Sequence, residues 1–180
     1  GFIEKEHGKG SRVTERRQTL GLLTVKGFSE AVGENVKTIF LQKPHHASWP
    51  EKLPFPPGKK ELASDSIYFE RLRCVGDTPV MLECNWFSAM ELEGFLAQKF
   101  VEGSFFKTLS QQYLIEVTES EQELRALFAD EKTADLLKIE KGSPILQISI
   151  KFSTSKPNLN IYSFLYCNTD KYPIGNIYTH

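Results

Sequence analysis

Two arginines separated by one residue are the side chains in this sequence best suited to hold an anion. Arg71 and Arg73 lie in the stretch SIYFERLRCV, whose composition is typical of a β-strand. Alternate residues of a strand point to the same face of a sheet, so both guanidinium groups would lie on one side. A guanidinium group presents a planar fork of N–H donors that matches phosphate or carboxylate oxygens. The pair could therefore form the anion-binding wall of a pocket.

The partners of these arginines depend on the turn, around a Gly-Asp pair, that leads into the next strand, PVMLECNWF. A two-residue turn would place them opposite two aliphatic side chains. A three-residue turn would place Arg71 opposite Glu83 and Arg73 opposite Met81, with Asn85 on the same face. We favour the second register because it separates polar from apolar side chains, whereas a slip of one residue would reverse every side chain. It gathers the apolar residues on the other face: Leu72, Cys74, Val80, Leu82, Cys84 and Trp86.

This polar face permits two interpretations. From the residues alone, the simpler one is a solvent-exposed face with cross-strand salt bridges, each of which contributes little stability. The other is a pocket wall, to which the starts of two short helices would add backbone N–H donors. Ser29 and Ser104 each come shortly after a glycine and would stand at the start of such a helix. Taken singly, each serine is explained as a simple helix cap without a role in binding.

The rest of the chain predicts an α+β fold. Alternating apolar patterns indicate strands near residues 36–44, 66–75, 79–87, 115–129, 145–153 and 159–168. Helical spacing with serine or aspartate caps predicts helices over 88–100, 103–113 and 130–140. Residues 44–58 contain five prolines and are expected to be loop, with one helical turn from Pro50. Several hairpins with short helices between them indicate one mostly antiparallel sheet with helices packed on it.

Composition excludes several classes of protein. With 40% hydrophobic and 25% charged residues, and no apolar run near the ~20 residues of a membrane span, the chain is neither disordered nor a membrane protein. Its three cysteines are widely spaced and predict reduced core residues of a cytoplasmic protein. His45 and His46 lack metal-ligand spacing, so we expect no metal and no cofactor. A net charge of −1 argues against a domain that wraps nucleic acid.

The first residues, GFIEKEHGKGSRV, predict a hairpin. The sequence Gly8-Lys9-Gly10-Ser11 favours a tight turn, because glycine adopts positive φ without steric cost. A hairpin of this size is not stable alone in water. We therefore expect it to be the end of a larger domain, and residues 1–17 are mildly basic while the remainder is mildly acidic.

Six motifs, in the same order, resemble the HutC branch of the GntR-type bacterial transcription regulators. The opening hairpin is similar to the wing of their winged helix-turn-helix domain. Five further pieces are similar to the UTRA effector domain over residues 18–175: GFSE, ERLRCVGDTPVMLE, GSFFKTL, ADLLKIEKGSPIL and NTDKY. The resemblance covers nearly the whole chain.

The resemblance implies a chorismate-lyase-like (UTRA) fold and a cytoplasmic, homodimeric regulator, expected to be a repressor, which responds to a small anionic metabolite. Residues 1–17 would be the remnant of the wing and its linker, and residues 18–180 the effector-binding domain. Gly8, Lys9, Gly10 and Ser11 would contact DNA together with the remainder of a winged-helix domain that this sequence lacks.

The resemblance also implies which residues bind the effector. Arg71 and Arg73 would hold its anionic group, and the other contacts would come from Glu83, Ser29, Ser104, Phe28 and Phe106. Gly27, Phe106 and Ile161 replace a serine, a tyrosine and, for many members, a glutamate. These departures predict a less polar pocket than that of members that respond to amino sugars.

Two other functions are compatible with these features. A chorismate-lyase-like enzyme would also bind an anionic substrate through arginines and a carboxylate, but a shared fold does not transfer an activity, and the wing remnant argues against it. A purely structural dimerisation module would have a collapsed, empty pocket. We expect the protein not to be an enzyme.

Overall fold

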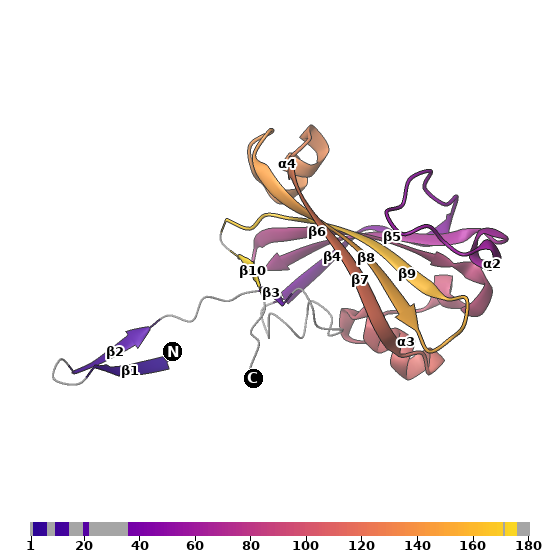
Figure 1. Cartoon of the computed structure of the whole chain (residues 1–180), viewed down its shortest axis with the longest axis horizontal. Helices are drawn as coiled ribbons and strands as arrows, with labels where there is room; N and C mark the ends of the chain where they lie inside the picture. Colours follow the sequence, from indigo (N-terminus) through magenta and orange to yellow (C-terminus); the bar gives the residue numbers. More distant parts are fainter. Residues whose placement is uncertain (1, 7–9, 15–19, 22–35, 171, 176–180) are drawn as a thin grey trace.

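The computed structural model describes residues 2–6, 10–14, 20–21, 36–170 and 172–175. Its centre is a six-stranded sheet in which every pair of neighbours is antiparallel (Figure 1). The strands, in their order across the sheet, are β4 (Val36–Ala47), β5 (Ser66–Val75), β6 (Thr78–Ser88), β9 (Asn160–Cys167), β8 (Pro144–Thr154) and β7 (Val117–Phe128). The predicted α+β class with one antiparallel sheet is confirmed.

Two small sheets complete the strands. β3 (Leu20–Gly21) and β10 (Ile174–Gly175) pair in parallel. β1 (Phe2–Glu6) and β2 (Gly10–Thr14) form the hairpin predicted at the start of the chain. Its turn is shorter than predicted, because Gly10 already pairs with Glu6, so Gly10 and Ser11 belong to the return strand. Gly8 and Lys9 lie outside the described residues.

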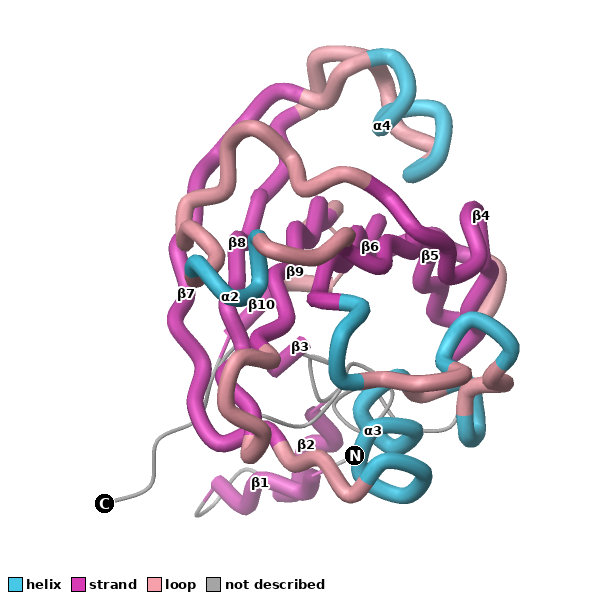
Figure 2. The backbone as a smooth tube through the Cα atoms, turned by 90° about the vertical axis from the view of Figure 1, so that its right-hand side faces the viewer, coloured by secondary structure: helices cyan, strands magenta, loops and turns pink. Residues whose placement is uncertain are grey.

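Short helices lie on both sides of the main sheet (Figure 2). They are α2 (Lys59–Leu62), the 3-10 helices η1 (Ala89–Glu91), η2 (Phe95–Ala97) and η3 (Val101–Gly103), α3 (Phe105–Tyr113) and α4 (Glu131–Leu137). Ser104 and Asp130 cap α3 and α4 as predicted. In the described part of the chain, no helix is long and apolar enough to cross a membrane.

The continuous helix predicted over residues 88–100 is wrong. Ser88 caps a helix there, but that helix is the single 3-10 turn η1. Gly94 adopts a left-handed conformation with φ 72°, which prevents a continuous helix and separates η1 from η2. The apolar spacing in this stretch looks helical, but two separate turns, not one helix, bury Leu92 and Phe95.

The proline-rich segment also departs from expectation. β4 continues through Pro44 to Ala47, because β4 is an edge strand and the ladder shifts register between Gln42 and His45. The helical turn expected from Pro50 is absent, since prolines at positions 54, 56 and 57 follow it closely. The turn forms instead at α2.

The hairpin of β5 and β6 has the favoured register, reached by a different turn. Arg71 faces Glu83 and Arg73 faces Met81, as predicted. The turn nevertheless has two residues, and a register shift follows Arg73, beside Pro79, which has no N–H for the ladder. The bulge moves Val80 into the cluster of Phe69, away from the Leu72 face where it was expected.

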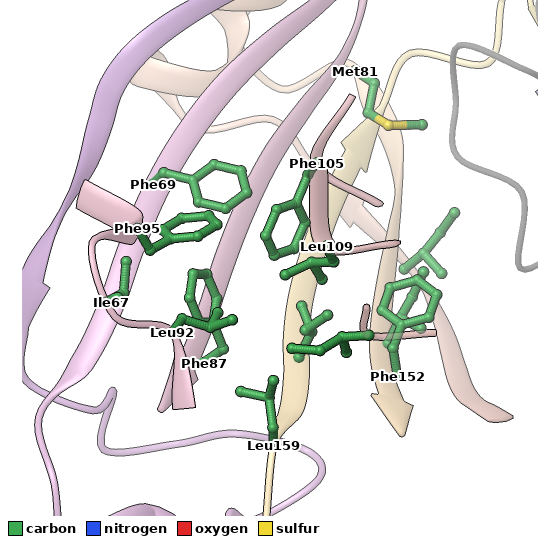
Figure 3. Close-up of a cluster of buried hydrophobic side chains, with 14 of the residues drawn as sticks. Ile67, Phe69, Met81, Phe87, Leu92, Phe95, Phe105, Leu109, Phe152 and Leu159 are labelled. Carbon is green, nitrogen blue, oxygen red and sulfur yellow. The ribbon is translucent and has the colours of Figure 1, made fainter. Parts of the chain in front are cut away.

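Each face of the sheet carries its own core. On one face, α4 packs on Leu72, Cys74 and Ile145. The face of Arg71 and Arg73 carries the larger cluster, in which phenylalanines from the strands meet those of η2 and α3 (Figure 3). The prediction of a polar face opposite an apolar one is therefore wrong. The three cysteines are buried and free, as expected.

Candidate functional site

The register of β5 and β6 brings the two arginines onto one carboxylate. Arg71 Nη2 donates to Glu83 Oε1 at 2.5 Å, and Arg73 Nη1 lies 3.7 Å from Glu83 Oε2. Arg71 is 3% exposed, Arg73 2% and Glu83 6%. A solvent-exposed face with salt bridges is therefore the wrong interpretation of these residues.

A chain of hydrogen bonds extends this cluster to the next strand. Ser163 Oγ on β9 donates to Asn85 Oδ1 at 2.6 Å, and Asn85 Nδ2 donates to Glu83 Oε1 at 3.0 Å. Asn85 and Ser163 face each other in the ladder, so the order of the strands makes this contact possible. Glu83 thus accepts from an amide as well as from a guanidinium group, which fixes its orientation.

The electrostatics favour ionised side chains with an excess of positive charge. Burial raises the pKa of the Glu83 carboxyl, but Arg71 and Arg73 outweigh burial and hold that pKa below its ordinary value. Burial lowers the pKa of Arg73 to about 10, which still leaves it cationic at neutral pH. Two guanidinium groups and one carboxylate sum to one net positive charge in a buried place. An anion would be bound there favourably.

Aromatic rings surround the guanidinium of Arg71. Its Cζ lies 5.0 Å from the ring centroid of Phe69, 5.5 Å from that of Phe100 and 5.9 Å from that of Phe40. At such distances the faces of the rings attract a cation. Arg71 Nη1 donates to Gly103 O at 3.2 Å, whereas Arg71 Nε is buried without a hydrogen-bond partner in the described part of the chain. A buried donor without a partner is uncommon and suggests that a ligand completes it.

The start of α3 lies next to the cluster of Arg71, Arg73 and Glu83. Gly103, which contacts Arg71, directly precedes Ser104, the N-cap whose Oγ accepts from Lys107 N. Phe106 is half-buried, and its ring packs on Phe105 and Phe152 at centroid distances of 5.4 and 4.9 Å. The phenylalanine rings around Arg71 therefore form a layer that continues through Phe105 to Phe106, on the side of β8.

Other expected residues are not brought to the arginines or cannot be placed. Phe28, Ser29 and Gly27 lie outside the described residues. Ile161 is fully buried in the aromatic cluster. Its neighbour Asn160 binds elsewhere: its backbone N and its Nδ2 donate to the carboxylate of Glu61, near α2. Four residues of the site were not predicted from the sequence: Phe40, Phe69, Phe100 and Ser163. Strand alternation could have found Phe69, two residues before Arg71, but no local pattern indicates Phe100.

The described residues form no metal-binding site of the usual kind. They contain no cluster of three or more histidine, cysteine, aspartate or glutamate side chains that could hold a metal ion. His45 and His46 are exposed on β4.

Comparison with known proteins places the chain in a family. The model of the UTRA domain matches residues 51–173, roughly two thirds of the chain. A probable fructoselysine utilization operon transcriptional repressor from Shigella flexneri is 24% identical over 178 residues, which cover 95% of this chain and 70% of that protein.

Solved structures share the fold. PhnF from Mycobacterium smegmatis superposes with a TM-score of 0.74 at 15% identity, covering 98% of this chain and 78% of that one. The C-terminal domain of the histidine utilization repressor from Pseudomonas syringae gives 0.63 at 20% identity, covering 81% of this chain and 99% of that one. The comparisons support the regulator interpretation and not the chorismate-lyase-like enzyme. The chain belongs to the UTRA family, the ligand-binding effector domains of GntR-type transcription regulators.

Proposed function

We propose that this domain binds a small anionic metabolite on the face of Arg71 and Arg73 and thereby controls DNA binding by a winged-helix domain. The observation that carries the proposal is the buried guanidinium of Arg71, whose Nε has no partner among the described residues. Burying a cation with an unsatisfied donor costs stability, and an anion bound beside it would offset that cost.

The residues around Arg71 suggest how the anion is held. One oxygen accepts from Arg71 Nε, and Arg73 adds charge while Glu83 fixes both guanidinium groups. Ser104 and the first N–H groups of α3 are next to the Gly103 carbonyl that Arg71 already contacts. Phe106 supplies an apolar wall, and we assign Phe28 and Ser29 to the same pocket from the motif they share with the family.

The domain organisation follows the family. We assign residues 1–17 to the end of a winged helix-turn-helix and its linker, and residues 18–180 to the effector domain. Gly8, Lys9, Gly10 and Ser11 would then touch DNA phosphates and the minor groove. Several relatives are named as repressors, which supports repression, a cytoplasmic location and a role other than catalysis. A gel shift with these 180 residues should show no sequence-selective binding, since one wing cannot read a major groove.

We also propose a homodimer, because paired DNA half-sites require two-fold protein symmetry. We expect its interface on β8 and β9, whose stretches ILQISIKFS and LNIYSFLYCN have apolar residues on both faces. Both strands lie inside the sheet, and most of their apolar residues pack in the two core clusters, but Tyr162 and Phe164 on β9 belong to neither. Light scattering at micromolar concentration should give twice the mass of the chain.

Anion binding is tested by thermal unfolding of the purified chain with a panel of phosphates and carboxylates. A ligand at a hundredfold excess over its Kd stabilises the domain by ~2.7 kcal/mol, which raises Tm by roughly 5–10 °C for a chain of this size. Arg71→Lys keeps the charge but removes the fork and Nε, so the shift should shrink strongly.

Arg125→Ala is the matched control, because Arg125 is 65% exposed on β7 and pairs with Glu123 at the surface. It should keep the full shift. If the unliganded Arg71→Lys variant folds normally and retains the wild-type shift with every anion, the assignment of the site is wrong. Turnover of chorismate by the wild-type chain would instead support the enzyme.

A further inference from the structure

The aromatic layer around Arg71 bears on what kind of anion this site accepts. We infer that the effector carries its anionic group on an aromatic or hydrocarbon body rather than on a polyhydroxylated sugar. The inference rests on the proposed function, since it concerns the body of a ligand whose charged group is bound at Arg71.

The first observation is the composition of the wall. A ligand oxygen that accepts from Arg71 Nε would place the rest of the ligand beside the rings nearest the guanidinium, those of Phe40, Phe69 and Phe100. Phe100 stacks on Phe105 at 5.6 Å, and Phe69 contacts Phe105 at 4.9 Å. The layer therefore continues as hydrocarbon beyond the rings in contact with the cation.

The second observation is that the neutral polar side chains of this face already have hydrogen-bond partners within the protein. Ser163 donates to Asn85, and Asn85 donates to Glu83. Thr108 Oγ1 donates to Ser104 O and accepts from Val101 N. Sugar hydroxyl groups would therefore meet rings or polar atoms in use, and a buried hydroxyl without a partner is costly.

The third observation separates this layer from an ordinary core. A core built for packing alone would not enclose a guanidinium with an unsatisfied N–H among phenylalanine rings, because apolar side chains of similar shape would be more stable there. Phe100 and Gly103 belong to the short turns η2 and η3 and their junctions, and Phe100 is only half-buried.

Two matched pairs of ligands test the inference by calorimetry: phenyl phosphate against glucose 6-phosphate, and 3-phenylpropionate against gluconate. Within each pair the anionic group is the same and only the body differs. We expect at least one aryl compound to bind at least tenfold more tightly than its sugar counterpart.

Phe100→Ala should weaken the aryl ligand at least fivefold and leave the sugar ligand within twofold. Phe128→Ala is the control, since Phe128 is 81% exposed on β7, and it should change neither. Equal or tighter binding of the sugar compounds, with that binding lost in Arg71→Lys, would overturn the inference and leave the anion site standing. Binding that is unchanged in Arg71→Lys would overturn both, whereas failure of all four compounds to bind would overturn the inference alone.

Discussion

Glu70 and Arg71 are consecutive residues of β5 that carry opposite charges to opposite faces of the sheet. Glu70 is buried on the α4 side, where it accepts from Lys132 Nζ at 2.9 Å and from Gln42 Nε2 at 3.0 Å. Arg71 is buried on the aromatic side against Glu83. The strand that carries the proposed anion site is therefore held on its other face by an ion pair to α4.

The contact between Glu70 and Lys132 should contribute measurable stability. Lys132→Ala leaves the Glu70 carboxylate buried with fewer donors, and we expect a loss of about 1–2 kcal/mol in the free energy of unfolding. Lys141→Ala is the control, because Lys141 and its partner Glu131 are both exposed. It should change the free energy of unfolding by less than ~0.5 kcal/mol. Urea denaturation measures both, and equal effects of the two variants would show that Lys132 does not hold α4.

Acid should weaken the fold through Glu83. Its pKa in the folded chain lies below the ordinary value of 4.5. The stabilisation is therefore complete above that value and is lost as the pH falls through the folded pKa. Asp130, whose pKa is also lowered, adds to the same slope. Glu83→Gln should be less stable at pH 7 and show a shallower loss between pH 5 and pH 3, measured by denaturation at each pH. An unchanged slope would mean that Glu83 is not ionised in the fold.

The cap of α4 is a separate test of local structure. Asp130 Oδ1 accepts from Thr133 N at 2.8 Å, so Asp130→Ala should cost about 1 kcal/mol and lower Tm by roughly 2–4 °C. Asp135→Ala, at an exposed position in the same helix, should have little effect. A similar loss in both variants would indicate a general effect of removing negative charge from α4.

The sequence predicted the elements better than it predicted their surroundings. The alternation of polar and apolar residues along β5 and β6 correctly placed Arg71 opposite Glu83. Side chains of a strand alternate between the two faces, so this pattern specifies the register. The same pattern could not reveal that the arginines are buried, since Phe40, Phe100 and Gly103, which lie against the guanidinium of Arg71, are distant from it in sequence. Two arginines, a glutamate and an asparagine on one face of a hairpin are typical of a solvent-exposed surface. Only the structure shows that other elements cover this face.

Local backbone features account for the remaining errors. Gly94 ends a pattern whose apolar spacing is helical, and its left-handed φ is visible only in the structure. The bulge beside Pro79 shifts Val80 to the other core. The predicted register is correct as far as Arg73 and Met81 and wrong on the turn side, where Cys74 pairs with Pro79. Sequence periodicity describes a regular element well, and fails where one residue interrupts it.

The three cysteines should be silent in the folded chain and reactive only after unfolding. Cys74, Cys84 and Cys167 are buried in three different strands and form no disulfide. Burial raises the pKa of all three thiols, that of Cys84 to about 12, so little reactive thiolate exists at pH 8. An aromatic disulfide reagent at pH 8 should label almost no thiol in the native chain within minutes. In 6 M guanidinium chloride it should label about three per chain, which matches the number of cysteines in the sequence. Rapid labelling of one thiol without denaturant would show that its strand opens locally, and comparison with a Cys→Ala variant at each position would identify which one.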